Sequence, residues 1–140
     1  MYMKPGVEAR KRFQFRLDLY SGVPIYRQII DQVTGAIAAG SLSGGDQLPT
    51  VRQLAVDLEI NPNTVIRAYR ELEIRGVLKS QQGTGTFINA QQTGRNSAER
   101  RRRLSQVIRE VVARAGAEGF TIEELTDELA NFEANGKNGG

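Results

Sequence analysis

The sequence predicts a mainly α-helical protein with a small β-hairpin, in which a winged helix-turn-helix domain is followed by a two-helix dimerisation tail. Three patterns carry this prediction. Two capped amphipathic helices are separated by a turn of two to three residues, two short extended runs follow them, and two helices with narrow apolar stripes come last. The length of 140 residues suits one small domain of this kind plus an appendage.

The composition excludes several classes of protein. Of the residues, 39% are apolar and 25% are charged, and the net charge of +3 is too small to name a partner. Cysteine and histidine are absent, so a thiolate nucleophile, a zinc-thiolate site and the commonest general base are missing. No apolar run approaches the roughly 18 residues of a membrane span, and no signal-type stretch follows the basic N-terminus. We expect a soluble, cytoplasmic protein without catalytic activity, cofactor, metal or membrane.

The first part of the chain is expected to lead into a helix. Residues 1–12 are polar and end in three basic residues, which predicts a flexible basic arm. Apolar and polar side chains alternate over residues 13–19, and this period of two predicts a short strand. Apolar residues then recur at helical spacing from about residue 24 to 39, and Gly40 provides the stop. The segment SLSGGDQL that follows is expected to be a loop.

A short helix is predicted at about residues 51–58. Thr50 is a good N-cap, and Gln53, three residues later, completes a capping-box pattern. Arg52 lies in the first turn, where a cation opposes the helix dipole, so a phosphate or a base edge nearby would compensate. The alternative for Arg52 is an ordinary exposed arginine. The apolar stripe of this helix is Val51, Leu54, Ala55 and Leu58.

A second helix starts directly after a short turn. Asn61 is a suitable cap, and Pro62 suits the first helical position because it has no N–H to leave unsatisfied there. Gly76 ends the helix. The two helices and the turn between them make a helix-turn-helix. The apolar stripe of the second helix is Val65, Ala68, Tyr69 and Leu72.

The opposite side of this second helix is basic and carries no acidic residue. At about 100° per residue, Asn63, Arg67 and Arg70 fall on it, whereas Glu71 and Glu73 fall on the flanks. Asparagine can pair with an adenine edge and arginine with a guanine edge, and both bind phosphate. The alternative is a solvated helix face. We favour a DNA-reading face, because the helix follows a tight turn and precedes a wing.

Two extended runs, Val77–Gln81 and Thr86–Asn89, predict a β-hairpin. Its glycine-bearing tip is not a P-loop, because no Lys-Ser or Lys-Thr and no helix follow the glycines. We expect this hairpin to be a wing that reaches a minor groove or the DNA backbone, with a plain β-turn as the alternative. The winged helix-turn-helix domain is thus expected at residues 13–90, and residues 90–97 form a polar linker.

The remaining residues predict a dimerisation region at residues 97–133. Helical spacing indicates one helix from about 97 to 115 and a second from about residue 122. Residues 95–114 carry seven Arg against two Glu, whereas residues 115–140 carry one Lys against six acidic residues, which favours a salt-bridged antiparallel helix pair over a second nucleic-acid site. Both stripes are dehydrated fully only against a second copy of the chain. The residues expected at this homodimer interface are Leu104, Ile108, Val111, Ile122, Leu125, Leu129 and Phe132.

The stretch PIYRQI … AGSL … LPTVRQLAVDLEINPNTVIRAYRELEIRGVL … GTGTF, residues 24–87, resembles the GntR family of bacterial transcription regulators. FRLDLYSGVPIY and the short tail are similar to its YtrA-type subfamily. The resemblance implies a homodimeric winged helix-turn-helix repressor that acts on a palindromic operator and dimerises through its tail. Many members carry a basic residue where Pro62 and Ile66 stand here, and Arg67 places its charge one position later. By motif position, the resemblance assigns DNA contacts to Arg52, Asn61, Asn63, Thr64, Gln82, Gly83 and Thr84.

We therefore expect a sequence-specific DNA-binding transcriptional regulator that represses, with a double-stranded operator and a second copy of the chain as partners. The alternative is a winged-helix module for protein–protein contact, which would not need an acid-free face. A phosphate-binding enzyme is a weaker alternative without histidine, cysteine or a P-loop. The tail is too short for the ligand-binding or aminotransferase-like domains of larger family members, so the sequence does not identify a small-molecule effector.

Overall fold

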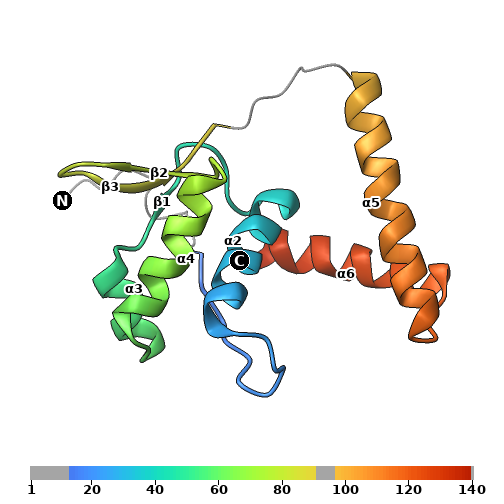
Figure 1. Ribbon diagram of the computed structural model, residues 1–140, viewed down its shortest axis with the longest axis horizontal. Coiled ribbons are helices and arrows are strands. Elements are labelled where there is room, and N and C mark those ends of the chain that lie inside the picture. Colours follow the sequence, from blue (N-terminus) through green and yellow to red (C-terminus); the bar gives the residue numbers. More distant parts are fainter. Residues whose placement is uncertain (1–12, 91–96, 140) are drawn as a thin grey trace. The chain divides into compact units, whose positions relative to one another are not determined.

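The computed structural model describes residues 13–90 and 97–139, and it contains two compact units, one within residues 13–90 and one within residues 97–135 (Figure 1). In these residues the first unit holds three helices and a three-stranded sheet, and the second unit holds two helices. The mainly α-helical fold, with a winged helix-turn-helix and a two-helix tail, is thereby confirmed. The basic arm expected at residues 1–12 lies outside the described residues. None of the helices described could cross a membrane, because none is both long and apolar enough.

Helix α2 spans Ile25–Ala39, close to the predicted bounds. It begins after Pro24, which is the N-cap residue rather than the first helical residue. Gly40 ends the helix with a left-handed φ of 85°, which glycine adopts without steric cost. Three of its residues, Ile29, Ile30 and Val33, are almost completely buried, so one face of α2 forms part of the core.

The segment before α2 is not a strand, so the strand predicted at residues 13–19 is wrong. Burial does alternate along it, but its backbone partners are two glutamine side chains of α2. The Gln32 amide bonds the N–H and the carbonyl of Arg16, and the Gln28 amide bonds those of Asp18. These two side chains satisfy the backbone polar groups that a neighbouring strand would otherwise satisfy.

Helices α3 (Val51–Leu58) and α4 (Pro62–Ile74) form the helix-turn-helix at the predicted positions. Thr50 and Gln53 make the expected capping box, in which each side chain accepts the backbone N–H of the other residue. Asn61 caps α4, and its side-chain oxygen accepts the Asn63 N–H at 2.8 Å. Since both caps are local, they fix where the two helices start without help from the rest of the fold.

The sheet has three antiparallel strands in the order β1-β3-β2. Strands β2 (Leu78–Gln81) and β3 (Gly85–Ile88) form the predicted hairpin. Strand β1 (Gln47–Leu48) lies in the segment SLSGGDQL, so the expectation of a loop throughout that segment is wrong. Gln47 is aligned with Phe87 and Leu48 with Thr86, and a two-residue strand carries no periodic signal that sequence reasoning could detect.

One core joins α2, α3, α4 and the sheet. The predicted apolar stripe of α4 lies in the centre of this core, since the exposed fractions of Val65, Ala68, Tyr69 and Leu72 are all 3% or less. Leu78 of β2 and Ile88 of β3 close the core from the sheet side. The core therefore holds α4 by one face and leaves its other face outside.

The tail consists of α5 (Ser97–Ala117) and α6 (Ile122–Gly139), so α6 ends beyond the predicted limit at residue 133. Gly119, with φ at 90°, lies in the turn between them. The two helices diverge from this turn and do not pack along each other (Figure 1). The apolar stripes predicted on them are therefore not covered within the described part of one chain.

Candidate nucleic-acid interface

The outward face of α4 is the centre of the candidate interface. Because the core holds the opposite face, the side chains of Asn63, Arg67 and Arg70 are exposed, as predicted from their spacing. Asn63 and Arg67 lie in the first two turns of the helix, which are the turns that approach base edges when such a helix enters a major groove. That these residues bind DNA stays a prediction.

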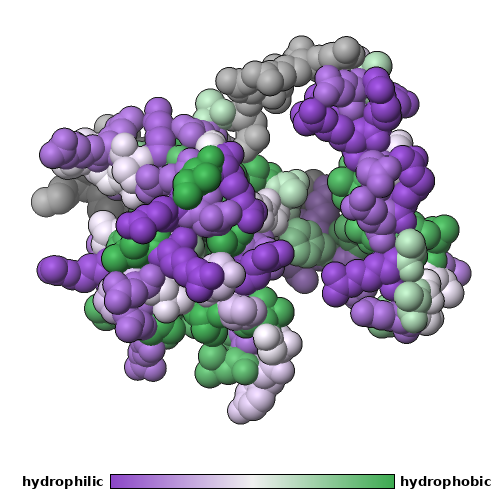
Figure 2. Space-filling view, viewed as in Figure 1, coloured by the Kyte–Doolittle hydropathy of each residue, from purple (hydrophilic) through white to green (hydrophobic). Residues whose placement is uncertain are grey.

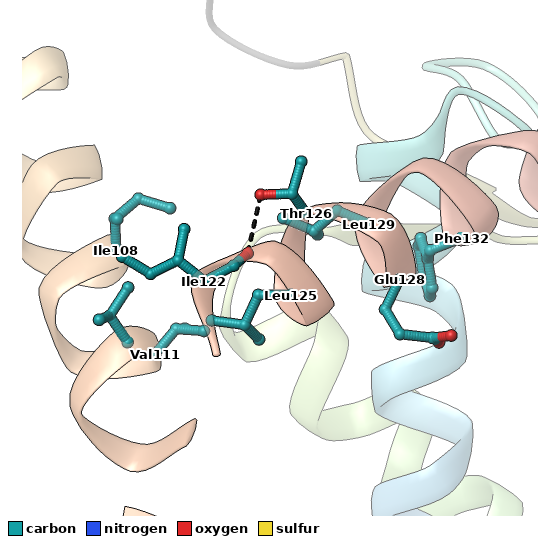
Figure 3. Close-up of a pocket in the computed structure, with 9 residues that line it drawn as sticks. Ile108, Val111, Ile122, Leu125, Thr126, Glu128, Leu129 and Phe132 are labelled. Atoms are coloured by element: carbon teal, nitrogen blue, oxygen red, sulfur yellow. Dashed lines mark hydrogen bonds between the residues drawn. The ribbon is translucent and has the colours of Figure 1, made fainter. Parts of the chain in front are cut away.

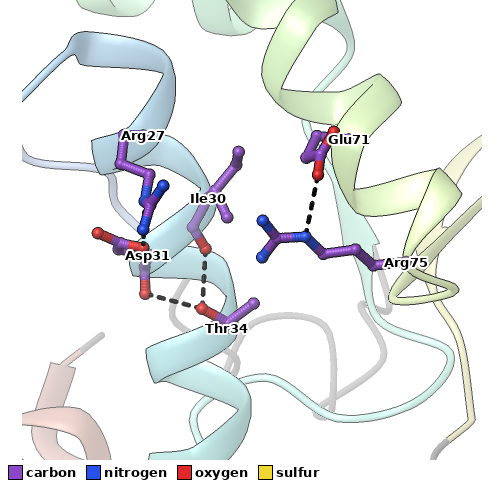
Figure 4. Close-up of polar contacts among 6 residues, drawn as sticks. All are labelled: Arg27, Ile30, Asp31, Thr34, Glu71 and Arg75. Atoms are coloured by element: carbon purple, nitrogen blue, oxygen red, sulfur yellow. Dashed lines mark hydrogen bonds and ion pairs between the residues drawn. The ribbon is translucent and has the colours of Figure 1, made fainter.

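The arginines of this surface have no acidic partner among the residues that the structure describes. Arg52 in the first turn of α3 and Arg70 make neither an ion pair nor a side-chain hydrogen bond there. Neighbouring charges are paired locally: Nε of Arg75, the C-cap residue of α4, lies 3.2 Å from Glu71 Oε1, and an Arg–Asp pair on α2 is 3.6 Å apart (Figure 4). The outward arginines are thus left available for an external anion.

Arg67 has an aromatic partner that the sequence did not reveal. Its Cζ atom lies 3.7 Å from the centroid of the Tyr26 ring, which belongs to the first turn of α2. Tyr26 is half-buried and packs against the core, so the ring is a fixed platform. A tyrosine and an arginine on separate helices share no local spacing, and no pattern in the sequence could have paired them.

The start of α4 is partly occupied by its own capping. The Asn61 side-chain oxygen accepts the Asn63 N–H, so the amide nitrogen and one remaining lone pair of that oxygen are left for DNA. Thr64 is half-buried, and its backbone N–H donates to the Asn61 carbonyl at 3.0 Å. These two residues are next to the outward face, and these contacts stabilise the start of the helix.

Helix α3 is held against α4 by a buried tyrosine. The Tyr69 hydroxyl donates to the Pro49 carbonyl at 2.7 Å, directly before the Thr50 cap. Burial raises the pKa of Tyr69 above its ordinary value, so the hydroxyl stays protonated and keeps donating. This bond sets the position of the first turn of α3, and Arg52 with it.

The wing tip is held by hydrogen bonds from two sides. Within the tip, the Thr84 N–H donates to the Gln81 carbonyl at 3.0 Å, and Gly83 adopts a left-handed φ of 82°. From β1, Gln47 Nε2 donates to the Thr84 carbonyl at 3.0 Å, and a Cβ at Gly85 would collide with the Gln47 side chain. The tip is therefore preorganised, and Gln47 is a contributor that sequence reasoning missed because its segment was expected to be a loop.

The wing residues differ in how free their side chains are. The Gln82 side chain is exposed and makes no hydrogen bond to the described residues, whereas the Thr84 hydroxyl donates to the Gln81 carbonyl at 3.1 Å. Ser80 of β2 donates to Glu73 Oε1 of α4 at 2.9 Å, which ties the wing to the end of that helix. Helix α4 and the wing thus form one surface with fixed internal geometry.

Six of the seven predicted dimerisation residues, all but Leu104, line the inside of the corner between α5 and α6. They border an apolar groove of about 360 Å³, shown in Figure 3 with Val111 of α5 facing Leu125 of α6. Leu125 is half-buried, and Leu104, which lies outside this groove on α5, is 62% exposed. The other predicted residues are 43–65% exposed: Ile108, Val111, Ile122, Leu129 and Phe132. A second chain at these positions stays a prediction.

The comparisons with known proteins agree on one family. Residues 25–88 match the family model of bacterial regulatory proteins of the gntR family. The HTH-type transcriptional repressor YtrA of Bacillus subtilis is 32% identical over 124 residues, which cover 89% of this chain and 95% of that protein.

Two solved structures are similar to most of this chain. A transcriptional antiterminator from Listeria monocytogenes has a TM-score of 0.69 at 28% identity, covering 91% of this chain and 96% of its own. YtrA from Sulfolobus acidocaldarius, a GntR-family transcription factor, has a TM-score of 0.55 at 34% identity, covering 71% of this chain and 97% of its own.

Proposed function

This chain belongs to the GntR family of bacterial regulatory proteins, and we propose that it represses transcription by binding a palindromic operator as a homodimer. It is a DNA-binding transcriptional regulator. The repressor role is supported by its similarity over nearly its whole length to a protein named as a transcriptional repressor. Operator binding would place the chain in the cytoplasm and would need no catalytic group.

The observation that best supports a DNA-binding surface is the outward face of α4, which has no acidic residue and lies beside a preorganised wing. With α4 in a major groove, Asn63 would face an adenine edge, and Arg67 and Arg70 would face guanine edges or phosphates. Arg52, without an acidic partner among the described residues, would bind the backbone from the start of α3. The wing tip, with Gln82 and Gly83 exposed, would follow the adjacent backbone or minor groove.

The two-fold arrangement is supported by the tail. Apolar side chains on α5 and α6 remain exposed around the corner groove, and a second copy would cover them. Hydrophilic side chains cover the first turns of α5 (Figure 2), where Arg100–Arg103 lie. The charged residues of α6 are mostly acidic. Opposite charges therefore favour α5 of one copy beside α6 of the other. A two-fold dimer would present two α4 helices to successive major grooves, which is why a palindromic site is expected.

The test is a titration of the full chain against duplex DNA from the promoter of its own operon, followed by fluorescence anisotropy. Arg70→Ala should weaken binding by about 5- to 150-fold, since one lost base or phosphate contact costs about 1–3 kcal/mol. Arg75→Ala, at the C-cap of the same helix, is the matched control, because Arg75 is already paired with Glu71. The affinity of this variant should differ from that of the wild type by less than about twofold.

Two outcomes would contradict the proposal. Equal affinity of wild type, Arg70→Ala and Arg75→Ala would show that α4 does not contact DNA. If the wild type bound this duplex no better than unrelated DNA at the same salt concentration, and in vitro selection from random duplexes enriched no sequence, the chain would instead be a winged-helix module for protein–protein contact. A reporter under the same promoter should be expressed more strongly when the gene of this chain is deleted.

A further inference from the structure

We propose that Tyr26 is a positioning residue for operator reading, because its ring holds the Arg67 guanidinium in the orientation in which the guanidinium meets DNA. The inference rests on the proposed function, since it assumes that the outward face of α4 is the DNA-reading surface. It adds a residue of α2, outside the helix-turn-helix and the wing, to the groups that set specificity.

The first step is the geometry of the pair. The Arg67 Cζ atom lies 3.7 Å from the Tyr26 ring centroid, well inside the roughly 6 Å limit for a cation–π contact. The ring is not free to follow the arginine, because Tyr26 is half-buried and packs against the core in the first turn of α2. Helix α2 in turn packs along α4. The platform and the helix that carries Arg67 therefore belong to one rigid unit.

The second step is the chemistry that the stack leaves available. A stacked guanidinium uses its π face for the ring, whereas its N–H donors lie in the plane of the group and stay exposed at the edge. That edge is the part that pairs in a bidentate manner with guanine O6 and N7, or with phosphate oxygens. A free arginine side chain loses rotamer entropy when it binds, so one that the ring already orders in part loses less.

The third step is the contrast with Arg75, the C-cap residue of the same helix. The Nε of Arg75 donates to Glu71, so a carboxylate occupies one of its N–H donors and offsets its charge. Tyr26 orders Arg67 without doing either, and Arg67 has no acidic partner among the described residues. An aromatic platform thus fixes the side chain and keeps its charge and its donors for DNA. The hydroxyl of Tyr26 makes no hydrogen bond to the described residues, so the ring is the part that acts.

The experiment is a double-mutant cycle in the full chain with Tyr26→Leu and Arg67→Ala, and with Tyr26→Phe as the matched control that keeps the ring. Affinity is measured by anisotropy for a duplex selected in vitro with the wild type and for an unrelated duplex of equal length. Tyr26→Leu should weaken binding to the selected duplex by about two- to fivefold and leave the unrelated duplex nearly unaffected. Tyr26→Phe should bind as the wild type does. In the Arg67→Ala background, Tyr26→Leu should have no further effect.

Each alternative result points to a different failure. An undiminished effect of Tyr26→Leu in the Arg67→Ala background would overturn the inference, and so would full affinity of Arg67→Ala for the selected duplex. Both results leave the proposed function standing, because that proposal is tested separately by the Arg70→Ala titration and by whether the wild type selects any sequence. Because Tyr26→Leu can lower stability, the stack is also measured in the wild type. The Arg67 Hδ protons should show a ring-current shift in NMR spectra of the wild type, and this shift should disappear in Tyr26→Leu. A wild type without the shift would overturn the inference.

Discussion

Truncation of Leu129 on α6 tests the homodimer and has a magnitude that follows from the structure. Leu→Ala removes three carbons, worth about 2.4 kcal/mol when they are fully buried, at about 0.8 kcal/mol for each. Leu129 is 61% exposed in one chain, so dimerisation can bury at most that share of it. The loss is then about 1.5 kcal/mol per copy and about 3 kcal/mol per symmetric dimer. The dissociation constant of the dimer should rise roughly 100-fold.

Sedimentation velocity from nanomolar to micromolar concentration measures this change. Leu19→Ala is the matched control, because Leu19 is 73% exposed and belongs to the first unit, not to the tail. Far-UV circular dichroism should be the same for all three proteins. Leu129→Ala should also bind operator more weakly, because the two halves of the site are then read independently. If Leu129→Ala dimerised as tightly as the wild type, the proposed tail interface would be wrong. A monomeric wild type with full operator affinity would also contradict it.

Three further predictions concern the first unit. Arg52→Ala should weaken specific and non-specific DNA alike and make the salt dependence shallower by about one unit of slope in titrations over several salt concentrations; a loss confined to one base pair would make Arg52 a base reader. Thr50→Ala should lower the free energy of unfolding by about 0.5–2 kcal/mol in urea, because it removes the capping box of α3; an unchanged midpoint would mean that tertiary contacts hold this terminus. Tyr69→Phe leaves the Pro49 carbonyl without its donor and should cost about 1–2 kcal/mol at neutral pH. Burial raises the folded-state pKa of Tyr69, so the unfolded chain loses this proton first and wild-type stability should fall above about pH 10, a fall that should be weaker in Tyr69→Phe.

The helices of the first unit could be predicted because their signals are short-range. A cap and its partner lie within three residues, as Thr50 and Gln53 do, and a buried stripe repeats every three or four residues along α4. Once the stripe of α4 is known, geometry places Asn63 and Arg70 on the opposite side, where the structure has them. The outward face of the candidate site therefore follows from the sequence, whereas its contacts with DNA stay predictions.

The errors share one cause. The alternation over residues 13–19 reports which side chains are buried, but a strand also needs a neighbouring backbone, and here two glutamine amides of α2 take that place. The prediction for strand β1 was wrong in the opposite sense, because a loop was expected and a strand is present. Its two residues, Gln47 and Leu48, have no periodicity, and they are a strand only because β3 lies beside them.

Local composition and periodicity thus define the helices, their caps and the side of each helix that is buried. The contacts between distant residues were decided by tertiary packing. Gln47 bonds to the wing tip 37 residues further along the chain, and Gln32 bonds to a backbone N–H 16 residues earlier, in place of a neighbouring strand. Arg67 stacks on the Tyr26 ring of another helix. The physical reason is range. A capping or stripe pattern is satisfied within one or two turns of chain, whereas a contact between distant residues exists only after burial of the core has brought their backbones together.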